Sequence, residues 1–403
     1  MSDRDLLIVG GGPAGMMAGL LFARAGVRTL VLEKHGDFLR DFRGDTVHPA
    51  TLDLFDELGL LDGLLARPHD EAPTLTGLVG GRPFTFADFS HLRTARGFIA
   101  LMPQWEFLDF ISSAARAYPG FSLQMNCEAK GVLSEGGRIT GVITADGQEL
   151  RAKLVIAADG RRSVLREAAA LPLQDLGAPM DVFWFRVPKP REAVNRTTGV
   201  FMPGRIIALI DRGDYWQCAF VFAKGSAETI RARGIAAFRA DVIAVAPMLG
   251  SAIEAVASWD DVKLLTVALD RLTRWHRPGL LAIGDAAHAM SPVGGVGINL
   301  AVQDAVAAAN ILAGPMARGE DVDGLLARVQ ARRLLPTRLI QGMQRAIQTQ
   351  VIGRLLAGGP PITRPPLILR LLQRFRLLQR IPAWIVGLGF RREHIRSPEA
   401  PRG

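Results

Sequence analysis

The chain has 403 residues, which is long enough for a sizeable hydrophobic core and two or three subdomains. Its two cysteines, Cys127 and Cys218, are too few for a disulfide scaffold or a thiolate metal site, and they fit a reducing, cytoplasmic location. The net charge of +9 is concentrated at one end: residues 331–403 hold fourteen arginines and two glutamates, hence +12, and the remainder is close to neutral at −3. This distribution argues against a nucleic-acid-binding protein.

The N-terminal segment has the layout of a dinucleotide-binding βαβ unit. Leu6 to Val9 form an apolar run of strand length, Met16 to Ala25 form a helix, and Thr29 to Leu32 form a second strand. Because the first run leads directly into a glycine motif, it is predicted to be a strand and not a signal peptide.

Three glycines and one acid carry the chemistry of this unit. Gly10, Gly12 and Gly15 have G-x-G-x-x-G spacing, and Glu33 ends the second strand. The first glycine makes a tight turn, the second lets a pyrophosphate approach the helix N-terminus, and the third lets helix and strand pack closely. The acid bonds a ribose hydroxyl, which argues against a 2′-phosphate on the bound nucleotide.

The middle of the chain changes from helical to strand-rich character. Helices are predicted over Leu52–Leu65 and Glu106–Ala117, with short strands and turns over 73–100 between them. From 180 to 230, alternating aromatic and β-branched residues predict an antiparallel sheet. The elements that lead back toward the N-terminal unit are a helix and two strands: Ser226–Ala255, Leu264–Leu269 and Leu280–Ile283.

Two further motifs follow. Residues 154–167 read LVIAADGRRSVLRE, a strand-like run that ends in Asp159-Gly160, with Ser163 and Arg166 next at helical spacing. Residues 284–305 read GDAAHAMSPVGGVGINLAVQDA, in which a glycine cluster precedes a helix. Glycines remove the side chains that would block a ligand, and free N–H groups at the helix start face its negative charge. This second run is predicted to lie flat against a large ligand.

In this order, the motifs G-x-G-x-x-G…E, D-G-x-x-S-x-x-R and G-D-A-A-H…P…G-x-G-x-N resemble those of the single-component FAD aromatic hydroxylases, the para-hydroxybenzoate hydroxylase family. The resemblance covers residues 1–335. It implies an α/β protein with a Rossmann-like FAD-binding domain of the glutathione-reductase type, an inserted antiparallel β-sheet substrate domain and a helical C-terminal tail.

The FAD-binding domain is then discontinuous in sequence. The resemblance implies three FAD-binding parts, two substrate-domain segments and one arginine-rich helical region. The FAD-binding parts are residues 1–72, 101–178 and 271–335, the substrate-domain segments are 73–100 and 179–270, and the helical region is 336–403.

The resemblance assigns the adenosine and phosphate end of FAD to the first half of the chain. Gly10, Gly12 and Gly15 cradle the pyrophosphate, and Glu33 binds the adenosine ribose. Arg43 lies over the phosphates. Further cofactor-binding residues are Gln104, near the ribityl chain, and Asp159 with Gly160, in the motif that supports both FAD and the nicotinamide donor.

The flavin end is assigned to the third motif. Asp285, after Gly284, holds a ribityl hydroxyl, and Pro292 with the loop Gly294, Gly295 and Gly297 lines the isoalloxazine. Asn299 completes the cofactor-binding set. Pro292 and Gly295 are also the candidate catalytic residues.

His48 is a third catalytic candidate, because it follows Thr46 in a loop expected near flavin and substrate; it either relays a proton or packs structurally. The seven histidines include no pair with the spacing of a metal motif, so no metal site is expected. Tyr118 and Tyr215 are the chain's tyrosines, so a tyrosine relay that deprotonates a phenol has thin support.

The implied reaction is a monooxygenation. NAD(P)H docks transiently, since the chain has one full G-x-G-x-x-G, and reduces non-covalently bound FAD. O2 then adds to give the flavin 4a-hydroperoxide, whose distal oxygen transfers to an aromatic or quinone-like ring. The alternatives are an FAD-dependent reductase or dehydrogenase of the geranylgeranyl-reductase kind and a non-catalytic flavin-binding protein. The protein is expected to be a monomer or a dimer.

The arginine-rich tail has three interpretations. Its leucines pack on the flavin domain as a helical cap, or its helix rests on anionic lipid or lines an access route for an apolar substrate, or it forms a dimer contact. We expect the tail to matter for partition or substrate access rather than for flavin chemistry. The expected location is therefore the cytoplasm, with peripheral membrane contact as an added possibility.

Overall fold

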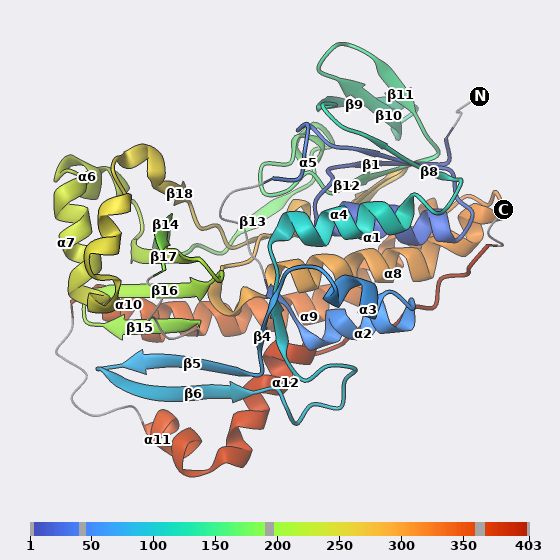
Figure 1. Ribbon diagram of the computed structural model, residues 1–403. Coiled ribbons are helices and arrows are strands. Elements are labelled where there is room, and N and C mark those ends of the chain that lie inside the picture. The colour runs from blue at the N-terminus through green and yellow to red at the C-terminus, as the bar shows by residue number, and fades with distance from the viewer. Residues whose placement is uncertain (1–3, 40–45, 190–196, 359–366, 401–403) are drawn as a thin grey trace.

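The computed structural model describes residues 4–39, 46–189, 197–358 and 367–400. Two sheets, one mostly parallel and one mostly antiparallel, lie side by side, and helices from the C-terminal third run beneath both (Figure 1).

The first sheet has six strands and holds the dinucleotide motif. The order is β20 (His276–Arg277), β21 (Leu280–Ala282), β12 (Leu154–Ala157), β1 (Leu6–Val9), β2 (Thr29–Leu32) and β8 (Phe121–Gln124). All neighbours are parallel except β20 and β21. β1, β2, β12 and β21 are buried throughout, which is why their sequences are continuous apolar runs. The predicted bounds of β1 and β2 are confirmed.

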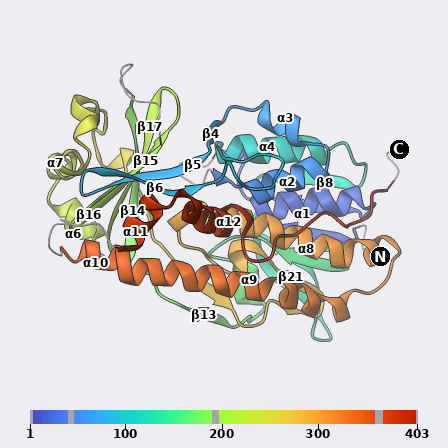
Figure 2. The same ribbon diagram turned by 90° about the horizontal axis from the view of Figure 1, so that it is seen from below.

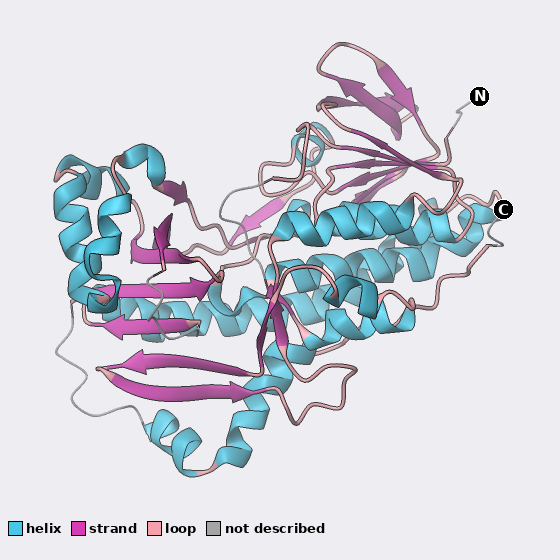
Figure 3. Cartoon of the chain, viewed as in Figure 1, coloured by secondary structure: helices cyan, strands magenta, loops and turns pink. Residues whose placement is uncertain are grey.

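Both faces of this sheet are covered (Figure 3). On one face lie α1 (Pro13–Arg24), α4 (Gln104–Ala115) and α8 (Gly297–Ala317), and on the other lies a small sheet of β9 (Ala129–Glu135), β10 (Arg138–Thr144) and β11 (Glu149–Arg151). α8 and the turn before it, Val293–Ala317, are long and apolar enough to cross a membrane, but 83% of the apolar 18-residue stretch within them is buried inside the protein. α8 is therefore the core helix of this half.

The second sheet has seven strands, in the order β18 (Lys263–Leu265), β14 (Met180–Pro188), β17 (Tyr215–Ala223), β16 (Arg205–Asp211), β15 (Thr198–Met202), β5 (Thr74–Val79) and β6 (Arg82–Asp88). Pairing is antiparallel except between β15 and β5. The outer face packs Phe183, Phe185 and Phe220 around Phe238 of α7 (Ile235–Val245). α6 (Ala227–Ala232), η1 (Pro247–Ala255) and η2 (Trp259–Asp261) complete this cover.

Short elements join the two halves. A three-stranded sheet of β3 (Thr46–Val47), β7 (Ile99–Leu101) and β4 (Asp70–Ala72) stands at the junction, and β13 (Leu173–Asp175) pairs with β19 (Asp270–Leu272). Three further short elements are α5 (Val164–Ala168), η3 (Gly284–Ala286) and η4 (Val293–Gly295).

The C-terminal third spans both halves. After η5 (Asp323–Leu325), α9 (Leu326–Ile347) continues through a π-helical turn, η6 (Gln348–Ile352), into α10 (Gly353–Leu356), which lies beside the second sheet (Figure 2). α11 (Leu367–Arg374), η7 (Arg376–Gln379) and α12 (Arg380–Leu388) then cross the junction from below. The last described residues lie alongside α1, where Ala400 N donates to Arg24 O at 2.8 Å.

Three predicted elements differ from those observed. The single helix expected over Leu52–Leu65 is two helices, α2 (Pro49–Glu57) and α3 (Leu61–Leu65), because Gly59 has a left-handed φ of +67°. The helix expected over Ser226–Ala255 is interrupted at Gly234, where φ is +84°. The strand expected over Leu264–Leu269 is only β18, because the chain turns away from the sheet after Leu265.

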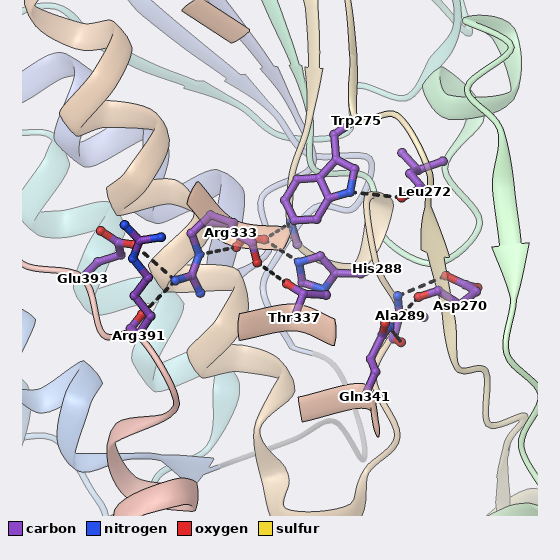
Figure 4. A network of polar contacts seen from close by, with 12 residues as sticks. Asp270, Leu272, Trp275, His288, Ala289, Arg333, Thr337, Gln341, Arg391 and Glu393 are labelled. Carbon is purple, nitrogen blue, oxygen red and sulfur yellow. Dashed lines mark hydrogen bonds and ion pairs between the residues drawn. The ribbon is translucent and has the colours of Figure 1, made fainter. Parts of the chain in front are cut away.

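A buried ion network ties the third motif to α9 (Figure 4). Asp304 of α8 is fully buried, and its carboxylate accepts hydrogen bonds from Gly284 N at 3.1 Å, His288 Nε2 at 2.6 Å and Arg333 Nε at 2.9 Å. Burial alone would raise the pKa of Asp304, but the charges and hydrogen bonds of His288 and Arg333 outweigh it and lower the pKa.

The tail completes this network. Arg333 Nη1 bonds Glu393 at 3.2 Å, and Glu393 pairs with Arg332 at 2.7 Å. Glu393 and Arg333 are both buried. The tail therefore also has a structural connection to the third motif, because Glu393 balances the arginine that holds Asp304.

Replacing Glu393 should unfold the protein far more readily than replacing a surface acid. Glu393→Ala removes one of the two acidic partners of buried Arg333, at a cost of about 3–5 kcal/mol in the free energy of unfolding. Glu320→Ala removes an exposed pair with Arg318 and should cost about 0–1 kcal/mol. Denaturant unfolding of both variants measures the difference, and equal midpoints would contradict the network's role.

Candidate active site

A cavity of about 2020 Å³ runs from the first sheet to the inner face of the second. Eleven of the predicted site residues line it, although they come from distant parts of the sequence: Gly10, Gly12, Glu33, Gln104, Asp159, Gly160, Asp285, Pro292, Gly294, Gly295 and Gly297. The three motifs thus converge on one space.

The three glycines of the first motif differ in what occupies the space where a side chain would lie. A Cβ at Gly10 would lie 2.3 Å from Ala158 O, and one at Gly15 would lie 1.9 Å from Gly10 O. A Cβ at Gly12 would meet nothing within 4 Å, although Gly12 lines the cavity and caps the N-terminus of α1. The first and third glycines therefore serve chain packing, and the second leaves an open cradle beside free helix N–H groups. This arrangement fits a pyrophosphate.

Glu33 is held rigidly at the cavity wall. Its Oε2 accepts from Gly11 N at 2.9 Å and its Oε1 from His35 N at 3.0 Å, and the residue is buried. A carboxylate oxygen has more than one acceptor position, so both oxygens can also accept from ribose hydroxyls.

Arg161 and Arg162, which sequence reasoning did not assign, bring positive charge to the same cavity. Arg161 Nε donates to Asp285 Oδ2 at 3.1 Å, so Asp285 is oriented by a partner from the second motif. The signal was present in the sequence, because both arginines directly follow Asp159-Gly160.

Asp159 itself shapes this loop. Its carboxylate accepts from Ser163 Oγ at 2.5 Å and from Leu165 N at 3.2 Å, at the start of α5. Burial raises its pKa. The side chain is thus engaged with the protein, while the backbone at Gly160 faces the cavity.

The loop of the third motif is fixed by two polar side chains. Thr46 Oγ1 donates to Gly295 O at 2.7 Å, and a Cβ at Gly295 would lie 2.3 Å from Thr46 Oγ1. Asn299 Nδ2 donates to Gly295 O at 3.2 Å and to Thr46 O at 3.1 Å. Gly295 is therefore required where the loop meets β3.

α9 holds the same loop from the other side. Gln344 Nε2 donates to Ser291 O and to Val293 O, both at 2.9 Å, and Gln341 Nε2 donates to Ala289 O at 3.2 Å. The loop before α8 is thus clamped on both sides.

Some predicted site residues do not line the cavity, because they pack against or hydrogen-bond to other parts of the protein. Gly15 packs α1 on β1, and Gly284 packs against Ala14. The Oδ1 atom of Asn299 accepts from His48 N and Thr51 Oγ1, both at 2.8 Å. Arg43 lies outside the described residues.

His48 is also absent from the cavity wall. It is 1% exposed, and its Nδ1 donates to Val386 O at 2.7 Å. Burial lowers its pKa to about 4, so the ring is neutral near pH 7. The structure places His48 as a contact between α2 and α12, which favours the packing interpretation over the proton relay.

The second half of the cavity has mainly apolar walls. One wall is the inner face of the seven-stranded sheet, with Met180, Val182 and Trp184 from β14. The opposite wall comes from the C-terminal helices, where Gln350 and Arg354 are joined by nine apolar residues: Met343, Ile347, Val351, Ile352, Leu355, Leu372, Pro382, Ile385 and Val386. Sequence reasoning left open whether the tail lines the cavity, and the structure shows that it does.

Among the described residues, no group of three His, Cys, Asp or Glu side chains lies close enough to hold a metal ion. The open glycine cradle, the fixed acid after β2, the paired Asp285 and the flat glycine loop all fit FAD. The site is therefore that of a flavin-dependent oxidoreductase.

Comparison with known proteins agrees. Residues 3–342 match the FAD-binding domain family, so the chain belongs to it and is an FAD-dependent monooxygenase of the para-hydroxybenzoate hydroxylase type. It is 33% identical to 6-methylpretetramide 4-monooxygenase of Streptomyces rimosus over 86% of this chain and 83% of that one. It is 28% identical to rifampicin monooxygenase of Streptomyces venezuelae over 75% of this chain and 62% of that one.

A solved structure, P. aeruginosa PqsL in complex with 2-aminobenzoylacetate, shares the fold. The TM-score is 0.76 at 24% identity, over 88% of this chain and 98% of that one.

The glycine assignments predict opposite effects of two alanine substitutions. Gly12→Ala should leave the thermal midpoint of the FAD-free protein nearly unchanged but weaken FAD binding, because its methyl group enters only the cradle. Gly15→Ala should lower the midpoint itself, because its methyl group overlaps Gly10 O. Calorimetry and FAD titration separate these effects. A Gly12→Ala protein with unchanged FAD affinity would show that the pyrophosphate lies elsewhere.

Proposed function

We propose that the enzyme hydroxylates a large, planar, polycyclic aromatic or quinone-like molecule, with FAD bound non-covalently and NAD(P)H and O2 as co-substrates. The continuous cavity carries this proposal. Small-molecule sites measure about 300–1,000 Å³, and about 2020 Å³ has room for a dinucleotide and a second sizeable ligand. The 6-methylpretetramide and rifampicin monooxygenases suggest a polyketide-like substrate class.

Bound FAD supplies the redox chemistry and the reaction with O2 that side chains cannot provide. The chain's own residues bind and orient it: the Gly12 cradle takes the pyrophosphate, Glu33 the adenosine ribose and Asp285 a ribityl hydroxyl. The loop from Pro292 to Gly297 presents backbone to the ring. The apolar walls beyond it exclude water from the second ligand's space.

Asp70 accepts the proton of a substrate hydroxyl in this proposal. It lines the cavity from β4, and its carboxylate has no hydrogen-bond or ion-pair partner among the described residues. Burial and the negative charge of Asp211 raise its pKa, with Arg212 and Lys189 acting in the opposite direction. Tyr118 and Tyr215 are not among the cavity-lining residues, so neither is placed for this task.

The proposal also places the enzyme in the cytoplasm, with its C-terminal helices in contact with a membrane surface. α11 and α12 form part of the cavity wall, so such contact would lie next to the substrate's space.

Oxygen uptake tests the proposed function directly. The purified protein should be yellow, and acid precipitation should leave the flavin in the supernatant. Polycyclic phenols should stimulate NAD(P)H oxidation together with O2 consumption, and label from ¹⁸O2 should enter the product. Stimulated NAD(P)H oxidation without O2 uptake would favour the reductase. A colourless protein that cannot be reconstituted with FAD would overturn the assignment.

Asp70→Asn tests the proton acceptor. Activity of the unchanged enzyme should fall as the pH drops below the raised pKa of Asp70, because only the ionised carboxylate accepts a proton. The variant should lose about 10²–10⁴-fold in kcat/KM and lose this acid limb, with recovery at high pH where the substrate ionises unaided.

The control for this substitution is Asp62→Asn, at a side chain that is 96% exposed. It should keep both the rate and the pH profile. An unchanged acid limb in Asp70→Asn, with FAD still bound, would show that another group takes the proton.

A further inference from the structure

The segment from α11 to α12 carries an unusual combination of exposed side chains. Six large apolar residues are exposed, from 39% for Leu371 to 68% for Leu377: Leu367, Leu371, Phe375, Leu377, Ile381 and Trp384. We call these six residues and the four arginines among them, Arg370, Arg374, Arg376 and Arg380, the basic apolar face.

The arginines of this face have no acidic partner among the described residues. The sequence from 367 to 390 contains no Asp or Glu at all. By contrast, three arginines elsewhere in the tail are paired with acids: Arg332 and Arg333 with Glu393, and Arg392 with Asp53. The face therefore combines uncompensated positive charge with exposed hydrocarbon.

The opposite side of the same elements closes the cavity. Leu372 of α11 and Pro382, Ile385 and Val386 of α12 line it, while Ala383 and Gly387 are buried against β6 and its following loop. Figure 2 shows α11 and α12 on the lower surface, across the junction of the two halves. One side of a thin helical layer thus faces outward and the other faces the substrate's space.

We propose that the basic apolar face docks on an anionic lipid surface, and that the layer then takes an apolar substrate from the membrane into the cavity. The second part rests on the proposed monooxygenase activity, whereas the docking deepens the membrane contact proposed above and does not depend on that activity. Amphipathic segments with arginine beside Leu, Phe and Trp bury their apolar side chains at the headgroup boundary while the arginines contact anionic headgroups.

Charge complementarity favours lipid over a second copy of the chain. A two-fold symmetric contact would bring the same patch of both copies together, and therefore four arginines against four with no acid between them. Like charges across an interface oppose association, whereas anionic headgroups neutralise them.

Vesicle sedimentation tests the docking with the FAD-loaded, full-length protein. Binding to phosphatidylglycerol-containing vesicles at low salt should exceed binding to pure phosphatidylcholine vesicles and should weaken as salt rises. Arg370→Gln, Arg374→Gln and Arg380→Gln together should lower the partition coefficient on the order of 10²-fold, at about fivefold for each arginine.

The matched control removes the same charge elsewhere. Arg116, Arg274 and Arg328 are exposed, have no ion pair among the described residues and lie outside this segment. Replacing all three by Gln should change partition by less than about threefold. Equal losses in the two triple variants would reduce the effect to net charge and overturn the docking face.

A second variant tests the apolar part. Phe375→Gln with Leu377→Gln keeps the charge and should still weaken vesicle binding, while bound FAD and circular dichroism stay unchanged. If the unchanged protein ignores anionic vesicles at low salt, the docking is wrong. If it is instead a dimer in light scattering that this variant dissociates, the face belongs to a second copy.

Substrate delivery is measured separately. A polycyclic phenol dissolved in anionic vesicles should be turned over with a lower apparent KM by the unchanged enzyme than by the arginine variant, with equal kcat for substrate in detergent-free solution. Vesicle binding with no KM difference would overturn delivery and leave docking standing. Failure of oxygen uptake with all substrates would count against the proposed function and leave the vesicle result unaffected.

Discussion

The FAD-binding half of the molecule depends on a buried carboxylate, Asp304, that does not line the cavity. Asp304 is fully buried, and it holds the backbone N–H of Gly284, the ring of His288 and the guanidinium of Arg333 at once. An isolated buried charge would be very costly, so each partner is required for the others to remain buried. Because its pKa is lower in the folded chain than the ordinary 3.8, Asp304 stabilises the fold above that pH, and the contribution is lost as pH falls through the folded pKa.

This network explains how the fold fixes the position of the Asp285 carboxylate. Asp285 follows the residue whose N–H is bound to Asp304, and Arg161 holds its carboxylate from the other side. A residue that positions a cofactor needs a rigid support of this kind, because small displacements of a binding group weaken its interaction strongly. The third motif therefore acts together with residues of α9 and the tail, which support it through the Asp304 network.

The sequence was sufficient to predict the convergence of the three motifs but not the direction of every side chain within them. Gly12 and Gly15 follow from the known geometry of the strand–turn–helix unit, which is local. Asn299 and His48 could not be assigned in this way. Whether each side chain meets a ligand or another segment depends on Thr46, Val386 and the approach of α12, which are distant in sequence. The alternation in β14 likewise predicted two faces, but only the fold decides that Trp184 faces the cavity and Phe185 the outer core.

The arginines of the tail include two groups with different roles. Arg332, Arg333 and Arg392 are paired with acids and stabilise the fold, whereas the four arginines of the basic apolar face have no such partner. A net charge of +12 over the segment does not distinguish these groups. Deleting the whole segment after Gly358 would also remove Glu393 and leave buried Arg333 with only part of its balance. Loss of membrane contact in such a truncation could then follow from unfolding. Substitutions confined to α11, η7 and α12 separate the two roles, because that layer contributes no partner to the Asp304 network.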